Sequence, residues 1–408
     1  MTRATSKPAP ATSAGWTLGL LAFVVLFGYA LARPATESMF LARYDADRLP
    51  AAWLAVALTA VVVVAAFNRA AARLTLGRVA IGAVALSAAS LVMLVLLDGA
   101  GIGGATFALY VWKDVHIVVI LECLWSFASL VFADDAARWA YGLFCAAGSL
   151  GGVAGNLAVG ALAAAMGTEQ TLWFALPLFA LDAALIRVVA RRAGHPAPKP
   201  TAAPRRDWQV IRDSRLLPWM IALIGLVQVV LTLLDFVFNE AVAAAYPLLD
   251  TRTEIIGRVY AAIDGISFVL QLGTGLLTRA LGLRRTLVAI PLLLTVAVAA
   301  LAVAPRFPLA AATKVMSKSL DYSLFRAAKE MLYRPLSYAE KTRGKAIVDV
   351  LTYRVAKGVA SLLLTGLLAL EMAQAALPAT VVLLFAWLAV TRVVTRRVPP
   401  PKAPLPSD

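Results

Sequence analysis

Residues 312–361 read ATKVMSKSLDYSLFRAAKEMLYRPLSYAEKTRGKAIVDVLTYRVAKGVAS, a charged stretch between segments that are apolar enough for lipid. An ionised side chain at the centre of a bilayer costs roughly 2.5 to 3.5 kcal/mol on insertion scales. Several such charges facing lipid would offset the gain from many leucines, so they must face one another or a watery cavity. A watery cavity inside a helical bundle is usually a substrate path. The stretch therefore predicts a transporter.

The charges of this stretch lie on two predicted helices that flank a loop. Pro335 and the polar residues 338–344 indicate the loop, because they cannot form a membrane helix. Three- and four-residue spacing predicts one shared face on each helix. The first face holds Lys314, Lys318, Asp321 and Phe325, and the second holds Lys345, Asp349, Tyr353 and Lys357.

The composition is that of a polytopic membrane protein. The chain has 408 residues, of which 61% are apolar, and apolar segments recur with about the length that crosses a bilayer as a helix. The formal net charge of +15 comes from Lys and Arg in short loops, which is a topology signal and argues against a nucleic-acid partner. Cys123 and Cys145 fall inside predicted spans, so we expect core packing and no disulfide framework.

Twelve transmembrane helices are predicted, in two six-helix halves. The predicted organisation is a tail over 1–15, a first half over 16–190, a basic Pro-rich linker over 191–216, a second half over 217–394 and a tail over 395–408. The first span is expected to end at about residue 32, with residues 33–37 closing it. The predicted spans cover about 16–32, 51–67, a segment ending at 97, 107–131, 141–166, a segment ending at 190, 217–238, 256–278, 287–304, two helices within 312–361 and a last helix ending near 394.

Loop charge predicts the orientation of these spans. Basic residues crowd the loops after the second, sixth, eighth, tenth and twelfth spans and are almost missing from those after the third, fifth, ninth and eleventh, which puts both termini in the cytoplasm. Residues 73–78 (RLTLGR) and 279–284 (RALGLR) resemble each other at corresponding positions of the two halves. Symmetric halves with a central linker favour a major-facilitator-like, all-α fold.

Residues 317–357 resemble the nucleotide transporter family, the ATP/ADP translocases of plastids and obligate intracellular bacteria. The matching residues are Ser317-Lys318-Ser319, Tyr322-Ser323-Leu324-Phe325, Lys329-Glu330-Met331, Tyr333, Pro335-Leu336, Gly344-Lys345-Ala346, Asp349-Val350 and Lys357. The resemblance implies a nucleotide or similar phosphorylated anion as substrate, moved by exchange. It also implies a multi-pass protein of a bacterial inner membrane.

Weaker similarities to the same family occur elsewhere in the chain. Asp114 and Asp235 stand where the family has functional glutamates, and Lys357 matches its late functional lysine. Near the first span Arg33 is retained, whereas Thr36 takes the place of a functional lysine. The full set of candidate substrate-binding residues is Arg33, Asp114, Asp235, Lys318, Tyr322, Asp349, Arg354 and Lys357.

Each candidate also has a structural interpretation. Lys357 and Lys318 suit phosphate contacts, but they could instead pair with Asp349 or Asp321. Asp114 and Asp235 are gating or coupling carboxylates in one interpretation and members of structural ion pairs in the other. In the first half, His116 is favoured as a packing residue rather than a proton relay, and Glu122 could be either a path-lining or a structural residue. Gly148, Gly151, Gly152 and Gly155 are expected to be close helix contacts.

Several function classes are excluded by what the sequence lacks. It contains no Gly-x-x-x-x-Gly-Lys phosphate loop, so an ATP-driven pump is not expected. Two histidines and two cysteines far apart do not make a metal site, and we expect no enzymatic activity and no cofactor. Two alternatives to a nucleotide carrier stay open. One is a proton-coupled major-facilitator exporter that uses Asp114 or Asp235, and the other is a membrane module that senses a ligand or partners a protein without transport.

Overall fold

The computed structural model describes residues 11–131, 138–193, 207–337, 340–345, 347–348 and 352–397. Asp349, one of the candidate residues, lies outside them. The helices form two compact units, which we describe separately. The first comprises Met1–Thr201 and Val242–Phe268, and the second comprises Ala202–Ala241 and Val269–Asp408.

The described residues contain eight helices that are long and apolar enough to cross a membrane, judged by length and composition. They are Gly15–Tyr44, Ala46–Ala71, Leu76–Gly99, Phe144–Met166, Thr168–Arg191, Leu217–Ala245, Leu249–Val303 and Ala373–Arg397. The expectation of an all-α, multi-span protein is therefore confirmed, and the number twelve stays a prediction.

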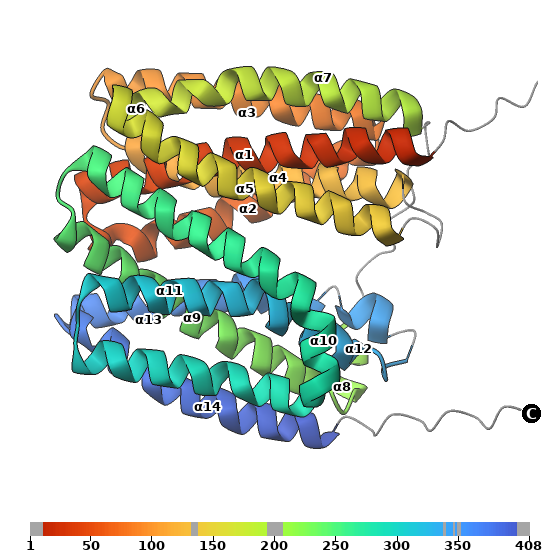
Figure 1. Cartoon of the computed structure of the whole chain (residues 1–408), viewed down its shortest axis with the longest axis vertical. Coiled ribbons are helices and arrows are strands. Elements are labelled where there is room, and N and C mark those ends of the chain that lie inside the picture. Colours follow the sequence, from red (N-terminus) through yellow and green to blue (C-terminus); the bar gives the residue numbers. More distant parts are fainter. Residues whose placement is uncertain are drawn as a thin grey trace, which may run out of the picture. The chain divides into compact units, whose positions relative to one another are not determined.

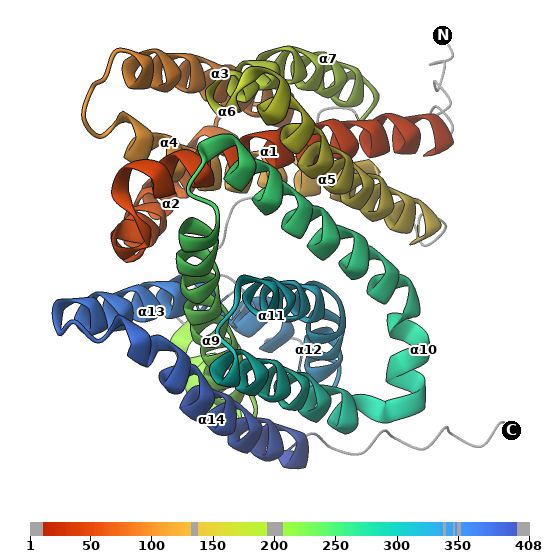
Figure 2. The same cartoon turned by 60° about the vertical axis from the view of Figure 1, so that its left-hand side comes forward.

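The first unit is built around α1 (Ala11–Tyr44). This helix packs against α4 (Ala105–Val131), α5 (Arg138–Met166) and α7 (Ala175–Ala193), as Figures 1 and 2 show. The unit also contains α2 (Leu49–Ala71), α3 (Leu76–Gly99), the short α6 (Thr168–Thr171) and the first part of α10 (Leu249–Val303), with 3-10 turns at Ala46–Arg48 and Leu172–Phe174. Their apolar faces form one continuous core.

Glycines bring the backbones of α1 and α5 into direct contact. A Cβ atom added at Gly151 would overlap the carbonyl oxygen of Phe23, and one at Gly155 would overlap that of Phe27. Gly148 also faces α1, where an added Cβ atom would lie at van der Waals distance from Leu26 and Ala22. These three α5 glycines are thus close helix contacts of the small-residue kind, as the sequence indicated.

The predicted end of the first span at residues 33–37 is wrong. α1 continues through this segment to Tyr44 with Pro34 inside the helix. A proline in the interior removes one backbone hydrogen bond, which membrane helices tolerate where neighbouring helices compensate. The charges of Arg33 and Glu37 do not need water because other side chains of the first unit neutralise them, as described below.

The second unit contains most of α9 (Leu217–Ala245) and the second part of α10 (Leu249–Val303). Its other helices are α8 (Asp207–Asp213), α11 (Phe307–Leu320), α12 (Arg326–Tyr333), α13 (Thr352–Ala369) and α14 (Ala376–Arg397). α10 bends at Gly282, whose φ of 73° and ψ of 161° are not helical (Figure 2). The bend falls where the sequence predicts the loop between two spans.

A π-helical turn, Asp321–Phe325, joins α11 to α12. A π turn places its hydrogen bonds between residues five apart, which rotates the following helix relative to a regular α-helix. The face expected from Lys314 to Phe325 therefore does not continue as one regular helix. Phe325 is buried in the apolar core of the second unit, with its ring centroid 6.0 Å from that of Trp387.

Candidate functional site

The two units each contain a cluster of charged side chains around one carboxylate. In the first unit, the central carboxylate of the cluster is that of Glu37 on α1. Its Oε1 lies 3.4 Å from Nε of Arg33 and 3.3 Å from Nζ of Lys113. Its Oε2 accepts a hydrogen bond of 2.5 Å from the hydroxyl of Tyr260, on α10. With Asp114, these residues are called the Glu37 cluster below.

Lys113 is the most enclosed member of the Glu37 cluster, with 1% of its side chain exposed. Its Nζ also lies 3.0 Å from Oδ1 of Asp114 and 4.0 Å from the centre of the Tyr110 ring. Arg33 stacks its guanidinium 3.7 Å from the centre of the Tyr260 ring. Two cations and two carboxylates therefore balance within the cluster, and the aromatic faces add cation–π attraction.

Asp235 on α9 is the centre in the second unit. Its Oδ1 lies 2.5 Å from Nζ of Lys314, and its Oδ2 lies 2.9 Å from Nζ of Lys318. The two lysines stand one helical turn apart on α11 and are both buried. Lys314 also faces the ring of Phe238 at 5.0 Å. Asp235, Lys314 and Lys318 are called the Asp235 cluster below.

The structure places four of the eight candidates in the two clusters, two in each. Arg33 and Asp114 belong to the Glu37 cluster, and Asp235 and Lys318 belong to the Asp235 cluster. The sequence considered Asp321 as a partner of Lys318, whereas the ion pair that the structure shows is with Asp235. Whether these residues bind a substrate stays a prediction.

Three of the other candidates, Tyr322, Arg354 and Lys357, lie on the π turn and on α13 of the second unit, and Asp349 is outside the described residues. Tyr322 is half-buried in the π turn, and its carbonyl oxygen accepts a hydrogen bond of 3.3 Å from the amide of Gln271. Arg354 and Lys357 are half-buried on α13. The carbonyl oxygen of Lys357 accepts a hydrogen bond from the Ser361 hydroxyl at 2.8 Å.

Four residues of the clusters are not among the sequence candidates: Glu37, Lys113, Tyr260 and Lys314. Three of them carry a sequence signal, because each is a charge within or beside an apolar segment. Lys314 even shares a predicted face with Lys318. Tyr260 has no such signal, since a tyrosine in an apolar helix is ordinary and its partner lies 223 residues away.

His116 is a packing residue, as the sequence favoured. Its ring stacks on Trp112 with centroids 5.0 Å apart and meets the edge of Phe179 at 5.1 Å. Its Nδ1 lies 2.9 Å from the Ser87 hydroxyl. Glu122 on the same helix is exposed in the first unit. Neither residue contributes a contact to the Glu37 cluster.

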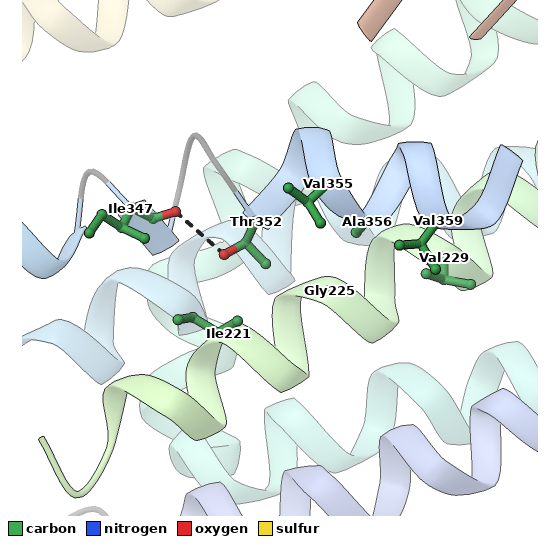
Figure 3. Close-up of a pocket in the computed structure, with 8 residues that line it drawn as sticks. All are labelled: Ile221, Gly225, Val229, Ile347, Thr352, Val355, Ala356 and Val359. Atoms are coloured by element: carbon green, nitrogen blue, oxygen red, sulfur yellow. Dashed lines mark hydrogen bonds between the residues drawn. The ribbon is translucent and has the colours of Figure 1, made fainter. Parts of the chain in front are cut away.

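An open groove of about 330 Å³ lies between α9 and α13 in the second unit (Figure 3). Its lining residues are Ile221, Gly225, Val229, Ile347, Thr352, Val355, Ala356 and Val359. The one hydroxyl in this lining, on Thr352, donates to the carbonyl oxygen of Ile347 at 3.4 Å. The groove has no charged group in its lining, so its chemistry does not suit an anion.

The chemistry of the Asp235 cluster, in which two lysines share one carboxylate, suits an anion better. Lysine ammonium groups make point contacts with carboxylate or phosphate oxygens, so an incoming phosphate can take over a contact that a carboxylate held. Among the described residues no group of three or more His, Cys, Asp or Glu side chains could hold a metal ion.

The fold resembles those of solved membrane transporters. The crystal structure of the nucleoside transporter NupG matches with a TM-score of 0.72 and 11% identity, over 92% of this chain and 98% of that chain. A bacterial homologue of the iron transporter ferroportin, in an inward-facing state, matches with a TM-score of 0.70 and 16% identity, over 94% and 98% of the two chains. The chain therefore shares the many-helix fold of these two solved proteins.

Similarity to one particular family is found in the C-terminal part of the chain. Residues 285–397 match the family described as TLC ATP/ADP transporter. The ADP,ATP carrier protein 1 of Chlamydia trachomatis is 40% identical over 89 residues, which are 22% of this chain and 15% of the carrier. The same carrier of Chlamydia muridarum is 47% identical over 58 residues, 14% of this chain and 11% of that one. The predicted resemblance to the nucleotide transporter family is confirmed, and the matched segments span less than a sixth of these relatives.

Proposed function

We propose that the protein is a secondary transporter that moves a nucleotide or a similar phosphorylated anion across a bacterial inner membrane. The observation that carries this proposal is the pair of buried lysines on Asp235. Lys318 and Lys314 lie inside the segment that matches the ATP/ADP transporter family, and their ammonium groups are 2.9 Å and 2.5 Å from the carboxylate. Phosphate oxygens are the substrate groups that such lysines would bind.

The proposed mechanism is exchange by alternating access. A substrate phosphate would replace Asp235 as the partner of Lys318, and release of the substrate would restore the lysine–carboxylate pair. The proposal contains no catalytic step and no cofactor.

The proposed topology has twelve spans in two six-helix halves, with both termini in the cytoplasm. The charge asymmetry of the loops supports it. A single cysteine placed at Gly101 should react with a membrane-impermeant maleimide in intact cells, with Cys123 and Cys145 replaced. One placed at Ala202 should react only after permeabilisation. Labelling of position 202 in intact cells would contradict the topology.

The transport test uses purified protein in liposomes. Vesicles loaded with ADP should take up labelled ATP, whereas empty vesicles should not, and an imposed pH gradient should not replace internal ADP. Flux driven by the pH gradient alone would support the proton-coupled exporter instead. Binding of nucleotides in a thermal-shift assay without any flux would support the module that does not transport.

Lys357 provides a binding test of the proposal. If it contacts a phosphate, Lys357→Ala removes a charge-assisted contact of about 1.5 to 3 kcal/mol, which is about a ten- to hundredfold loss of nucleotide affinity. Melting of the empty protein should change little. A variant that melts early but binds nucleotides normally once folded would show that Lys357 neutralises an acid and contacts no substrate.

A further inference from the structure

One carboxylic acid of the first unit stands apart from the Glu37 cluster. Asp182 lies on α7 in the candidate span Thr168–Arg191, with fourteen residues of the span before it and nine after it (182 − 168 and 191 − 182). Its exposed fraction is 4%. Its Oδ1 is buried and has no hydrogen-bond partner among the described residues. The charged groups of the Glu37 cluster, in contrast, all contact an opposite charge.

The surroundings of Asp182 are apolar. Phe179 and Ile186, about one helical turn before and after it, belong to the apolar core of the first unit and are 6% and 2% exposed. α7 packs against α1, α3 and α4, and Figure 1 shows it running beside α3. Leu178 on α7 lies against Gly28 on α1. Among the described residues, this environment supplies no cation to an ionised carboxylate.

The ionisable groups on the neighbouring elements do not compensate Asp182. The groups in question are Tyr29, Arg33, Glu37, Arg43 and Tyr44 on α1, Arg78 and Asp98 on α3, Tyr110, Lys113, Asp114, His116, Glu122 and Cys123 on α4, Glu169 on α6, and Arg187 and Arg191 on α7. None forms an ion pair or hydrogen bond with Asp182 among the described residues. Lys113 is held by Glu37 and Asp114, and Asp98 accepts a hydrogen bond from the Thr106 hydroxyl.

Burying a carboxylate without a partner removes its hydration and replaces it with nothing, which is the most costly form of polar burial. The protonated acid is neutral, and in this form it is no more polar than an asparagine amide. We propose that Asp182 is a proton-binding site, at which the carboxyl group of α7 holds a bound proton at neutral pH in the folded protein.

The bound proton allows α7 to pack closely on α1, which carries Arg33 and Glu37. Loss of the proton would create an unpaired charge inside this contact and weaken it. The site uses no substrate contact, so it does not depend on the proposed transport function. It also differs from the acids that the sequence offered for proton coupling, because Asp114 and Asp235 are paired with lysines.

Infrared difference spectroscopy of the purified full-length protein tests the proposal directly. At pH about 7 the wild-type spectrum should contain the C=O stretching band of a protonated carboxyl group that is missing from Asp182→Asn. The control is Asp213→Asn, an exposed aspartate on α8, which should leave this region of the spectrum unchanged. Identical carboxyl bands in wild type and Asp182→Asn would overturn the proposal.

The pH dependence of unfolding gives a second, independent measurement. Above the pH at which an unfolded aspartate ionises, only the folded state keeps the proton, so the folded state of the wild type becomes less favoured as pH rises. Asparagine binds no such proton, so Asp182→Asn lacks this dependence of folding stability on pH. From about pH 4, where an unfolded aspartate ionises, up to the pH at which the folded carboxyl group loses its proton, the folded-to-unfolded ratio of the wild type should fall relative to that of the variant by about tenfold per pH unit, and above that pH the difference should stay constant.

A stability difference between wild type and Asp182→Asn that does not change with pH would contradict the proposal. Failure of the variant to fold would contradict it as well, because asparagine has nearly the shape of a protonated aspartate and the same zero charge. Asp182→Glu and Asp182→Ala are less useful, since both change the volume of a buried side chain.

Discussion

The Glu37 cluster and the Asp235 cluster both neutralise a carboxylate inside a helical unit, but with different sets of side chains. Each has one carboxylate that two cations share, and each takes a buried lysine from another helix: Lys113 from α4 and Lys314 from α11. In the Glu37 cluster that lysine also contacts a second acid, Asp114, so charges balance locally. In the Asp235 cluster the second partner is another lysine, Lys318.

This difference indicates different roles for the two lysines. Lys113 is shared by two carboxylates, so its departure would weaken the neutralisation of both Glu37 and Asp114. Lys318 shares its carboxylate with Lys314, so it can give up that contact while Asp235 stays neutralised. A cation that can change partners is what anion binding requires, whereas a cation fixed between two acids holds helices together.

The largest expected effect is at Lys113. Replacing it by methionine removes the cation that Asp114 contacts in the structure and one of the two that Glu37 contacts, and breaking a buried ion pair by removing one partner costs about 3 to 5 kcal/mol. We expect Lys113→Met to lower the melting temperature strongly and to reduce expression. Thermal unfolding monitored by tryptophan fluorescence measures it. Melting equal to that of the wild type would mean that the Glu37 cluster does not hold its helices.

The Asp235 cluster should tolerate single changes and not the double one. Lys314→Met and Lys318→Met should each cost no more than about 1.5 kcal/mol, because Asp235 keeps one lysine in either variant. The double variant leaves the carboxylate without both, and should cost about 3 to 5 kcal/mol, more than the sum of the single effects. Chemical denaturation of all four proteins closes this double-mutant cycle, and strictly additive effects would refute the sharing of one carboxylate.

The glycine contacts test whether backbone packing places the Glu37 cluster. Gly151→Ala would push α1 away from α5, because the new Cβ overlaps the Phe23 carbonyl oxygen, and overpacking of this kind costs about 1 to 3 kcal/mol. The matched control is Gly82→Ala on α3, where nothing lies within 4 Å. That variant should be neutral or stabilised by up to about 1 kcal/mol, since alanine favours helices over glycine. Equal effects in the two variants would show that the close contact is unimportant.

The smallest expected effect is at the exposed ion pair of Lys345 and Glu330, whose charged atoms are 2.6 Å apart. Their side chains are 37% and 49% exposed, so solvent screens the attraction. Lys345→Met should cost less than about 1 kcal/mol, and added salt should reduce the difference further. A loss comparable to that of Lys113→Met would break the distinction between buried and exposed charge on which the comparison depends.

Sequence periodicity and charge were sufficient for the fold class and for part of the site. Repeated apolar segments with charges on one face require a multi-span helical protein whose charges are neutralised inside it, and this holds whichever helices pair. The resemblance of residues 317–357 to nucleotide transporters needed only local motifs. Lys318 and Asp235 could be singled out because charges in apolar helices are costly.

Other features could be decided only by the tertiary structure. A helical period tells which side of one helix a lysine occupies, but not which other helix it meets, so the pairing of Asp235 with Lys314, 79 residues away, was beyond any local pattern. The same holds for Tyr260 and Glu37. The continuation of α1 past Pro34 and the π turn after Leu320 could not be predicted from the sequence either. Whether a charge or an irregular turn is stable inside a membrane helix depends on the side chains that pack against it.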